Sequence, residues 1–132
     1  MKRAILIFTV VVSFFIVSGF SQELVKVPEI ITKAITEGNA ENLAKYFNSN
    51  LEFVINNSEE VYSKAQAEIV LKQFFENNQP KSFTIVHEGT QGKLSFVIGK
   101  LVTEQQQQFR IHFLLTNISG KWAITRFTID KN

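Results

Sequence analysis

Residues 93–130 read KLSFVIGKLVTEQQQQFRIHFLLTNISGKWAITRFTID, and this run establishes the class of fold. Apolar and polar residues alternate over Lys93–Thr103, Phe109–Asn117 and Trp122–Asp130, which is the two-residue period of β-strands. The glutamines at 105–108 and the turn Ile118–Lys121 separate the three segments. Connections this short join antiparallel neighbours, so the sequence predicts a meander.

Two further elements are expected before the meander, a helix and then one more strand. Ser82–Glu88 alternates in the same way and reaches the meander through the turn 89–92. Before it, Ser63 and Gln66 form a capping-box pattern, in which each side chain satisfies a backbone N–H of the other residue. An apolar face follows at positions 67, 70, 71, 74 and 75, so a helix is predicted from this cap to about Asn77, ahead of Pro80.

Two shorter helices are expected at the start of the folded region. Pro28 suits a first helical position and Gly38 suits the position just past a helix end, with an apolar stripe of Ile30, Ile31, Ala34 and Ile35 between them. Asn39 then caps a second helix whose apolar positions run to Phe47. A short strand, Leu51–Ile55, follows before Asn56-Asn57-Ser58.

The predicted fold class is therefore α+β, in the order α-α-β-α-β-β-β-β, with three N-terminal helices packed on one face of a curved antiparallel sheet. The sheet face toward the helices is expected to carry Phe83, Ile85, Leu94, Phe96, Ile98, Phe109, Ile111, Phe113 and Leu115. The outer face is expected to carry Val97, Leu101, Leu114, Phe127 and Ile129. So many apolar residues on an exposed face predict an interface, and we expect a homodimer that pairs through the outer sheet face.

The N-terminus has the pattern of an export signal. Lys2 and Arg3 precede an apolar run from Ala4 to Val17, and small residues follow at 18, 19 and 21. The apolar run would span only about 21 Å as a helix, short of the roughly 30 Å of a membrane core. We expect residues 1–21 to be a signal peptide and residues 22–132 a single domain, exported to the periplasm or beyond the cell without a stable membrane anchor.

Charge and cysteine content exclude several classes of function. Of the 14 basic residues, Lys2 and Arg3 belong to the signal, which leaves 12 against 12 acidic residues in the mature chain. The remaining lysines are scattered, whereas a nucleic-acid partner favours a clustered basic face, so no nucleic-acid binding is expected. The chain has no cysteine, which excludes disulfides, a thiol nucleophile and a cysteine-linked lipid anchor.

The element order over Val27–Asp130 resembles the nuclear transport factor 2-like superfamily, which includes ketosteroid isomerases and SnoaL-type polyketide cyclases. The segments GNAENLAKYF (38–47), VYSKAQAE (61–68) and FRIHFLL (109–115) are similar to a group of short secreted bacterial proteins in that superfamily, classed as a domain of unknown function. The resemblance implies a cone-shaped fold. It implies no particular activity, because this fold hosts enzymes, binders and dimerisation modules.

No motif predicts catalysis, a cofactor or a metal. Isomerases of the resembled superfamily place a carboxylate base opposite a tyrosine inside the cone, and no position here matches that set; Glu52 and Glu68 could substitute, but glutamates of this kind are usually solvated. The two histidines, His87 and His112, lack metal-ligand spacing. No Gly-rich loop leads from a strand into a helix, so no nucleotide site is expected.

Six residues are candidates for lining a pocket in the cone. His87 shares parity with Phe83 and Ile85 and is expected to point inward, either as a pocket base or as a hydrogen-bonded residue at a strand end, while His112 should point outward with Arg110. Arg126 either marks a bulge or reaches the cavity as a partner for an anion. The full set of predicted ligand-binding residues is Tyr46, Tyr62, His87, Phe96, Phe113 and Arg126.

Three classes of function remain open. The first is an exported non-catalytic domain that binds a small apolar or amphipathic ligand in a Phe-lined cone. The second is a homodimeric interaction module of the cell envelope, and the third is an enzyme of the isomerase or cyclase kind. A filled interior with an apolar outer sheet would favour the second class, whereas a void with two facing ionisable groups would favour the third.

Overall fold

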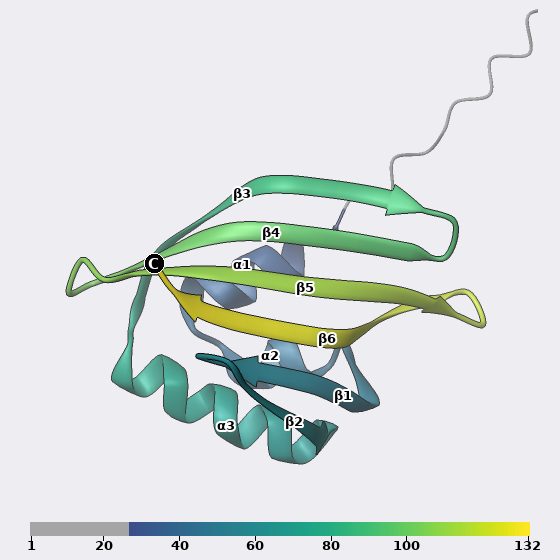
Figure 1. Ribbon diagram of the computed structural model, residues 1–132, viewed down its shortest axis with the longest axis horizontal. Coiled ribbons are helices and arrows are strands. Elements are labelled where there is room, and N and C mark those ends of the chain that lie inside the picture. Colours follow the sequence, from purple (N-terminus) through teal and green to yellow (C-terminus); the bar gives the residue numbers. More distant parts are fainter. Residues whose placement is uncertain (1–26) are drawn as a thin grey trace, which may run out of the picture.

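The computed structural model describes residues 27–132, which fold into three helices and a six-stranded sheet (Figure 1). The elements are α1 (Glu29–Glu37), α2 (Ala40–Ala44), β1 (Phe47–Ile55), β2 (Ser58–Ser63), α3 (Lys64–Asn77), β3 (Pro80–Gln91), β4 (Leu94–Thr103), β5 (Gln108–Ile118) and β6 (Lys121–Lys131). The strand order is β2-β1-β6-β5-β4-β3. The predicted α+β class is confirmed, and the expected signal peptide 1–21 lies outside the described residues.

The helices begin and end close to the expected residues. Gly38 adopts the left-handed conformation (φ 65°) that ends α1, while Pro28 is the N-cap of that helix rather than its first residue. The Asn39 side chain caps α2 by accepting a 3.0 Å hydrogen bond from the Asn42 N–H. At α3 both bonds of the capping box form, from Gln66 N–H to Ser63 Oγ at 3.2 Å and from Ser63 N–H to Gln66 Oε1 at 3.0 Å.

The sheet differs from the expectation in two details near its start. Asn56 and Asn57 both have positive φ angles, 47° and 68°, which make a two-residue hairpin turn and produce the unpredicted strand β2. Phe47 is the first residue of β1 rather than the last apolar residue of α2. β1 pairs with β6 in parallel, so the sheet is mixed, whereas β3 to β6 form the expected antiparallel meander.

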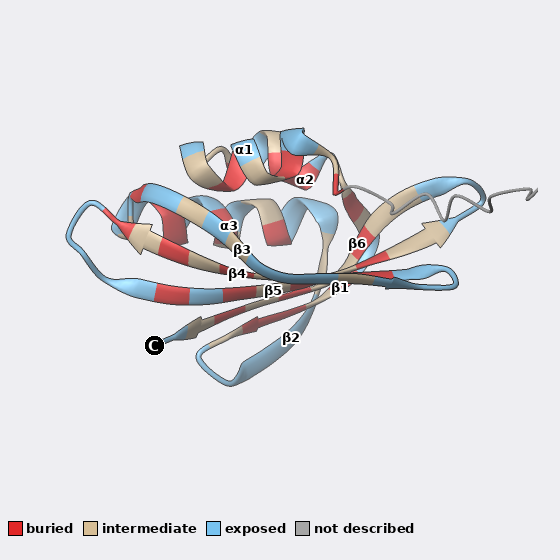
Figure 2. Ribbon diagram, turned by 90° about the horizontal axis from the view of Figure 1, so that it is seen from above, coloured by how far each residue is buried: buried red, intermediate tan, exposed pale blue. Residues whose placement is uncertain are grey.

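The core lies between the helices and one face of the sheet, as Figure 2 shows from above. Phe127 is its centre, because this ring stacks on Phe53 at 5.5 Å and on Phe113 at 5.9 Å and meets Phe47 edge-on at 6.0 Å, measured between ring centroids. Phe74 adds a T-shaped contact to Phe109 from the helix side. Aromatic rings from helices and strands therefore fill the space between the two layers.

The face assignment was correct for β5 and wrong for β4. Phe109, Ile111, Phe113 and Leu115 are buried in the core, as predicted. On β4 the helix-facing residues are Val97 and Leu101, fully buried, while Leu94 and Phe96 are 51% and 39% exposed on the outer face with Ile98. β4 is apolar on both faces, so alternation alone does not decide which set points inward.

Two bulges cause the remaining differences in face. In β3 the register shifts between Ile85 and His87, so Val86 is an extra residue and His87 is on the outer face instead of inside the cone. In β6 the extra residue is Thr125, and beyond it Phe127 and Ile129 are buried in the core rather than exposed outside. A single inserted residue reverses the face of every position after it.

Within residues 27–132, no helix is long and apolar enough to cross a membrane.

Candidate functional site

The interior of the cone is occupied by side chains. The hollows that stand out over residues 27–132 all open at the surface, three of them along the helices and a smaller one on the outer face of the sheet. The two widest, of about 640 and 670 Å³, are open grooves lined mainly by charged and polar residues of α1 to α3. Ligand binding inside the cone stays a prediction, and none of these four hollows is lined by the core rings of Phe53, Phe113 or Phe127.

The six predicted pocket residues divide between the two sides of the sheet. Phe113 is fully buried in the core, and Tyr46 and Tyr62 are half-buried against it, with the ring of Tyr62 6.0 Å from that of Phe53. His87, Phe96 and Arg126 are on the outer face, away from the helices. The inward positions predicted for His87 and Phe96 are wrong, because the bulge at Val86 and the parity of β4 turn them outward.

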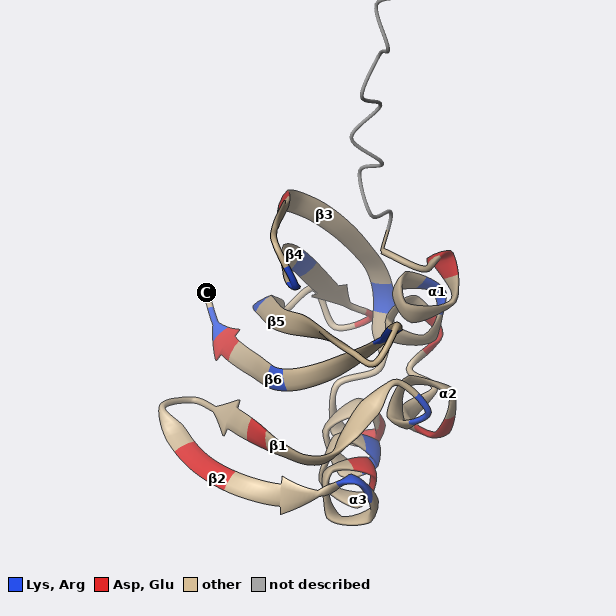
Figure 3. Ribbon diagram, turned by 90° about the vertical axis from the view of Figure 1, so that its right-hand side faces the viewer, with Lys and Arg blue, Asp and Glu red and all other residues tan. Residues whose placement is uncertain are grey.

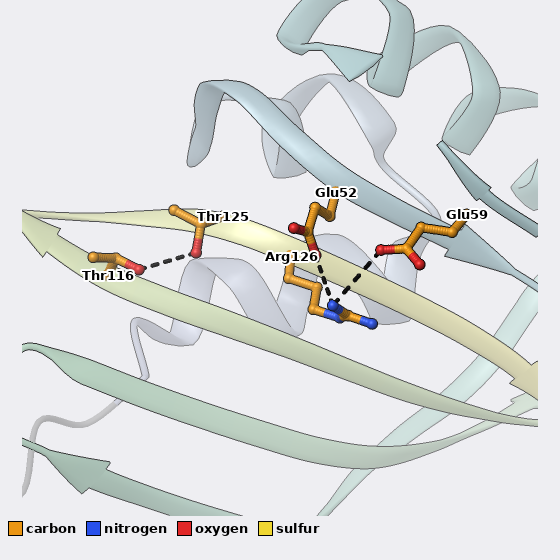
Figure 4. Close-up of polar contacts among 5 residues, drawn as sticks. All are labelled: Glu52, Glu59, Thr116, Thr125 and Arg126. Atoms are coloured by element: carbon orange, nitrogen blue, oxygen red, sulfur yellow. Dashed lines mark hydrogen bonds and ion pairs between the residues drawn. The ribbon is translucent and has the colours of Figure 1, made fainter. Parts of the chain in front are cut away.

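Arg126 is held on the outer face by acidic residues of the neighbouring hairpin. Its Nη1 donates a 2.6 Å hydrogen bond to Glu52 Oε2 on β1 and is 3.8 Å from Glu59 Oε1 on β2 (Figure 4). Beside it, the hydroxyls of Thr116 and Thr125 are 2.9 Å apart, which joins the bulged segment of β6 to β5. The side chains of Arg126 and Glu52 are 39% and 47% exposed, so their ion pair is a surface feature.

Apolar side chains occupy the middle of this face. We use the term outer patch for Leu94, Phe96 and Ile98 of β4 and Leu114 of β5, which are adjacent in the sheet register. Phe96 covers Gly89 of β3 so closely that a Cβ at that glycine would be 2.6 Å from the ring. Leu114 is the single member that the sequence correctly assigned to the outer face; the other residues expected there, Val97, Leu101, Phe127 and Ile129, are all in the core.

Basic residues adjoin the outer patch on β4 and β5. Lys100 is directly opposite Arg110, and His112 follows on the same face of β5. Partial burial lowers the pKa of His112 below its usual 6.5, and the charges of Arg110 and Arg126 lower it further, while Asp130 acts in the opposite direction. Figure 3 shows Lys or Arg (blue) on β4 and β5 and Asp or Glu (red) on β2, the strand at the far edge of the sheet.

The Lys100–Arg110 pair could not be predicted from the sequence, because it depends on the register of the β4–β5 hairpin. The hairpin between β4 and β5 turns at residues 104–107, and its register pairs Leu101 with Phe109 and Lys100 with Arg110. A hairpin centred on the glutamine run 105–108 would pair Lys100 with Phe113, so the run does not indicate the observed register. Among residues 27–132, no group of three or more His, Cys, Asp or Glu residues could hold a metal ion.

Comparisons with known proteins agree with this fold. The family described as "Domain of unknown function (DUF4783)" matches residues 28–130. A crystal structure of a DUF4783 family protein from Bacteroides uniformis is 33% identical, with a TM-score of 0.76, and the match covers 80% of this chain and 97% of that one. The corresponding protein from Bacteroides fragilis is 32% identical, with a TM-score of 0.76 and coverages of 80% and 99%.

More distant structures share the fold alone. An NTF2-like protein of unknown function from Shewanella baltica is 12% identical, with a TM-score of 0.63, and the match covers 79% of this chain and 86% of that chain. This likeness shows that the chain has the fold of an NTF2-like protein, which is the fold that the sequence resemblance implied. No curated protein matches the chain.

Proposed function

This chain belongs to the DUF4783 family of NTF2-like domains, and from that premise we propose that it is an exported, non-catalytic interaction module that pairs with a second copy of itself through the outer face of its sheet. Export follows from the signal pattern of residues 1–21. The pairing rests on one observation, the cluster of large apolar side chains exposed on the outer face of β4 and β5.

The outer patch has the composition of an interface core. Leu94 and Phe96 are 51% and 39% exposed, and they adjoin Ile98 of β4 and Leu114 of β5. Apolar side chains that cluster on an exposed surface mark interaction sites, and aromatic residues are enriched at the centres of interfaces. The Arg126–Glu52 ion pair on one side and the Lys100–Arg110 pair on the other provide the polar rim that surrounds such a centre.

A second copy is the occupant that charge favours. On the outer face, Glu52 and Glu59 are on the β1–β2 half, while Lys100 and Arg110 are on the β4–β5 half. A two-fold axis running along the strands between β5 and β6 places each half against the opposite half of the partner. Acidic residues of one copy then face basic residues of the other, which favours pairing and fixes its orientation.

Native mass spectrometry of the protein purified from its own host tests this proposal. We expect a dimer whose chains begin at Gln22. Leu94→Glu and Phe96→Glu should each weaken the dimer by at least about tenfold, because each puts a negative charge on the apolar surface of β4 that faces the acidic β1–β2 hairpin of the partner. The matched control is Ile69→Glu, which adds the same charge at an exposed position of α3, 59% exposed, and should leave the dimer intact.

The two patch variants differ in their risk of misfolding, because Phe96 packs on Gly89 whereas Leu94 is half exposed near a strand end. A circular dichroism spectrum like that of the wild type establishes that each variant is folded. A wild-type protein that remains monomeric, or a Leu94→Glu variant that dimerises as well as Ile69→Glu, would contradict the proposed pairing.

A further inference from the structure

A small hollow on the outer face combines an apolar floor with basic side chains. It measures about 220 Å³ and lies where β3, β4 and β5 run side by side, while Arg126 is on β6, the next strand along the same face. Its lining residues are Val86, His87, Ile98, Gly99, Lys100, Arg110 and Asn132. The proposed pairing of two copies does not explain why this hollow exists.

Lys100 and Arg110 are an unneutralised pair. They are direct partners in the β4–β5 ladder, and like charges opposite each other on neighbouring strands destabilise a sheet. In the part of the chain from 27 to 132, the ion pairs involve Lys33 and Arg126, and neither Lys100 nor Arg110 has a carboxylate oxygen within 4.0 Å. Asp130 is opposite Arg110 on β6 but forms no ion pair with it.

The contrast with Arg126 makes this absence informative. Arg126 is on the same face, and two glutamates lie within 4.0 Å of its guanidinium. Within a single copy, the fold therefore neutralises Arg126 and leaves Lys100 and Arg110 without a carboxylate oxygen within 4.0 Å. An external anion would remove the repulsion between them.

The bulge in β3 forms the apolar part of the hollow. Because Val86 is the extra residue between Ile85 and His87, the β3–β4 ladder is interrupted next to Ile98. Val86 is 58% exposed at this point, and Ile98 is half-buried beneath it. An inorganic anion would use the two charges but leave this apolar surface in water.

We propose that the hollow binds a small carboxylate with a short hydrocarbon tail, the carboxylate on Lys100 and Arg110 and the tail on Val86 and Ile98. The guanidinium of Arg110 can donate two parallel hydrogen bonds to a carboxylate, while Lys100 acts as a point charge. The volume corresponds to about seven water molecules at roughly 30 Å³ each, which limits the ligand to about eight non-hydrogen atoms. Hexanoate has this size and chemistry.

Titration of the ¹⁵N-labelled protein with hexanoate tests the site. We expect saturable shifts of the backbone amide signals of Val86, His87, Ile98 and Arg110. Two probes separate the contributions: 1-hexanol has the tail without the charge, and inorganic phosphate has charge without a tail. Both should bind at least about tenfold more weakly than hexanoate, a loss of about 1.4 kcal/mol. Equal binding of phosphate would reduce the hollow to a simple anion site and overturn the proposal, as would equal binding of hexanol.

Variants connect the binding to the two cations. Arg110→Gln and Lys100→Gln should each weaken hexanoate binding by about fivefold or more. Lys121→Gln removes the same charge at the exposed start of β6 and should leave binding unchanged. The amide spectrum of each variant shows whether it is folded. Absence of saturable shifts in the wild type, or an equal loss in Lys121→Gln, would overturn the assignment.

Pairing would bring Glu52 and Glu59 of a second copy toward Lys100 and Arg110, so hexanoate should bind at least as tightly when pairing is weakened. The titration is repeated on Leu94→Glu, whose residue is outside the hollow and whose self-association is expected to be weaker. A wild-type monomer that binds hexanoate would retain the site and contradict the pairing. A wild-type dimer would retain the pairing, and the site would be contradicted if neither that dimer nor the Leu94→Glu variant bound hexanoate.

Discussion

His112 shows how neighbouring charges affect a single side chain on this face. It is half-buried on β5 between Ile98 of β4 and Thr128 of β6, with Arg110 on its own strand and Arg126 on β6. Burial and these two cations oppose a positive charge on the imidazole, and Asp130 offsets them only in part, so the pKa of His112 is lowered from 6.5.

A lowered pKa predicts how stability changes with pH. The unfolded chain takes up a proton at His112 near pH 6.5, while the folded chain takes it up only at lower pH, so the unfolded state binds more protons in that interval. The free energy of unfolding should therefore fall as the pH decreases from 6.5 through the folded pKa, and the contribution should be fully present above pH 6.5. Urea unfolding at a series of pH values measures this effect.

The matching variant is His112→Gln, which keeps a polar side chain of similar size but cannot be protonated in this range. Its unfolding free energy should decrease less than that of the wild type over the same interval. An NMR titration of the imidazole should give a pKa below 6.5. Identical pH dependence of the two proteins would contradict the role assigned to His112.

The residue types of the outer face could be predicted better than their positions. The sequence correctly indicated that His112 and Arg110 point outward, because β5 contains no irregularity before Leu114. The prediction that His87 and Phe96 point inward was wrong because it assumed unbroken alternation in β3 and a single apolar face in β4. Bulges depend on how two strands fit together, and this information is not local to either strand.

At the level of elements, the capping box is the feature that the sequence predicted best. Ser63 ends β2 and starts α3, and its side chain and that of Gln66 satisfy two backbone N–H groups at the helix start. Both partners are local in sequence, so the motif was readable without tertiary information.

Ser63→Ala removes the cap and should lower the free energy of unfolding by about 1 kcal/mol. The control is Ser49→Ala, at an exposed position of β1 where the same atom is removed but no helix begins, and it should have a smaller effect. Urea denaturation of the three proteins measures the difference. Equal losses in both variants would mean that the Ser63 cap contributes no special stability.

The strand β2 could not be predicted from alternation because its residues Ser58–Ser63 are mostly exposed and polar. What creates it is the turn at Asn56 and Asn57, since asparagine accepts the positive φ angles that a tight hairpin requires. Turn chemistry, rather than hydrophobic pattern, was the available signal, and it also positions Glu59 near Arg126.

At the scale of the whole molecule, one aromatic side chain connects the parts of the sheet. The Phe127 ring on β6 contacts Phe53 and Phe47 of β1 and Phe113 of β5, and it is fully buried. It therefore joins the N-terminal hairpin to the meander within a single cluster.

Phe127→Ala should lower the free energy of unfolding by about 3–5 kcal/mol, because it removes a buried ring and leaves a cavity among three others. Phe96→Ala is the matched control, since the same atoms are removed from the partly exposed outer face, and the loss should be less than half as large. Thermal and urea unfolding measure both. A larger loss for Phe96→Ala would contradict the assignment of the core to the helix-facing side.

The order in which the strands pair limits when this molecule can fold. β1 (Phe47–Ile55) hydrogen-bonds to β6 through partners such as Phe53 and Phe127, which are separated by most of the described chain. During synthesis, β1 and β2 leave the ribosome long before their neighbour exists. Until β6 emerges, the nascent chain holds an edge of free backbone groups and unburied phenylalanines, the kind of surface that chaperones bind and that aggregates.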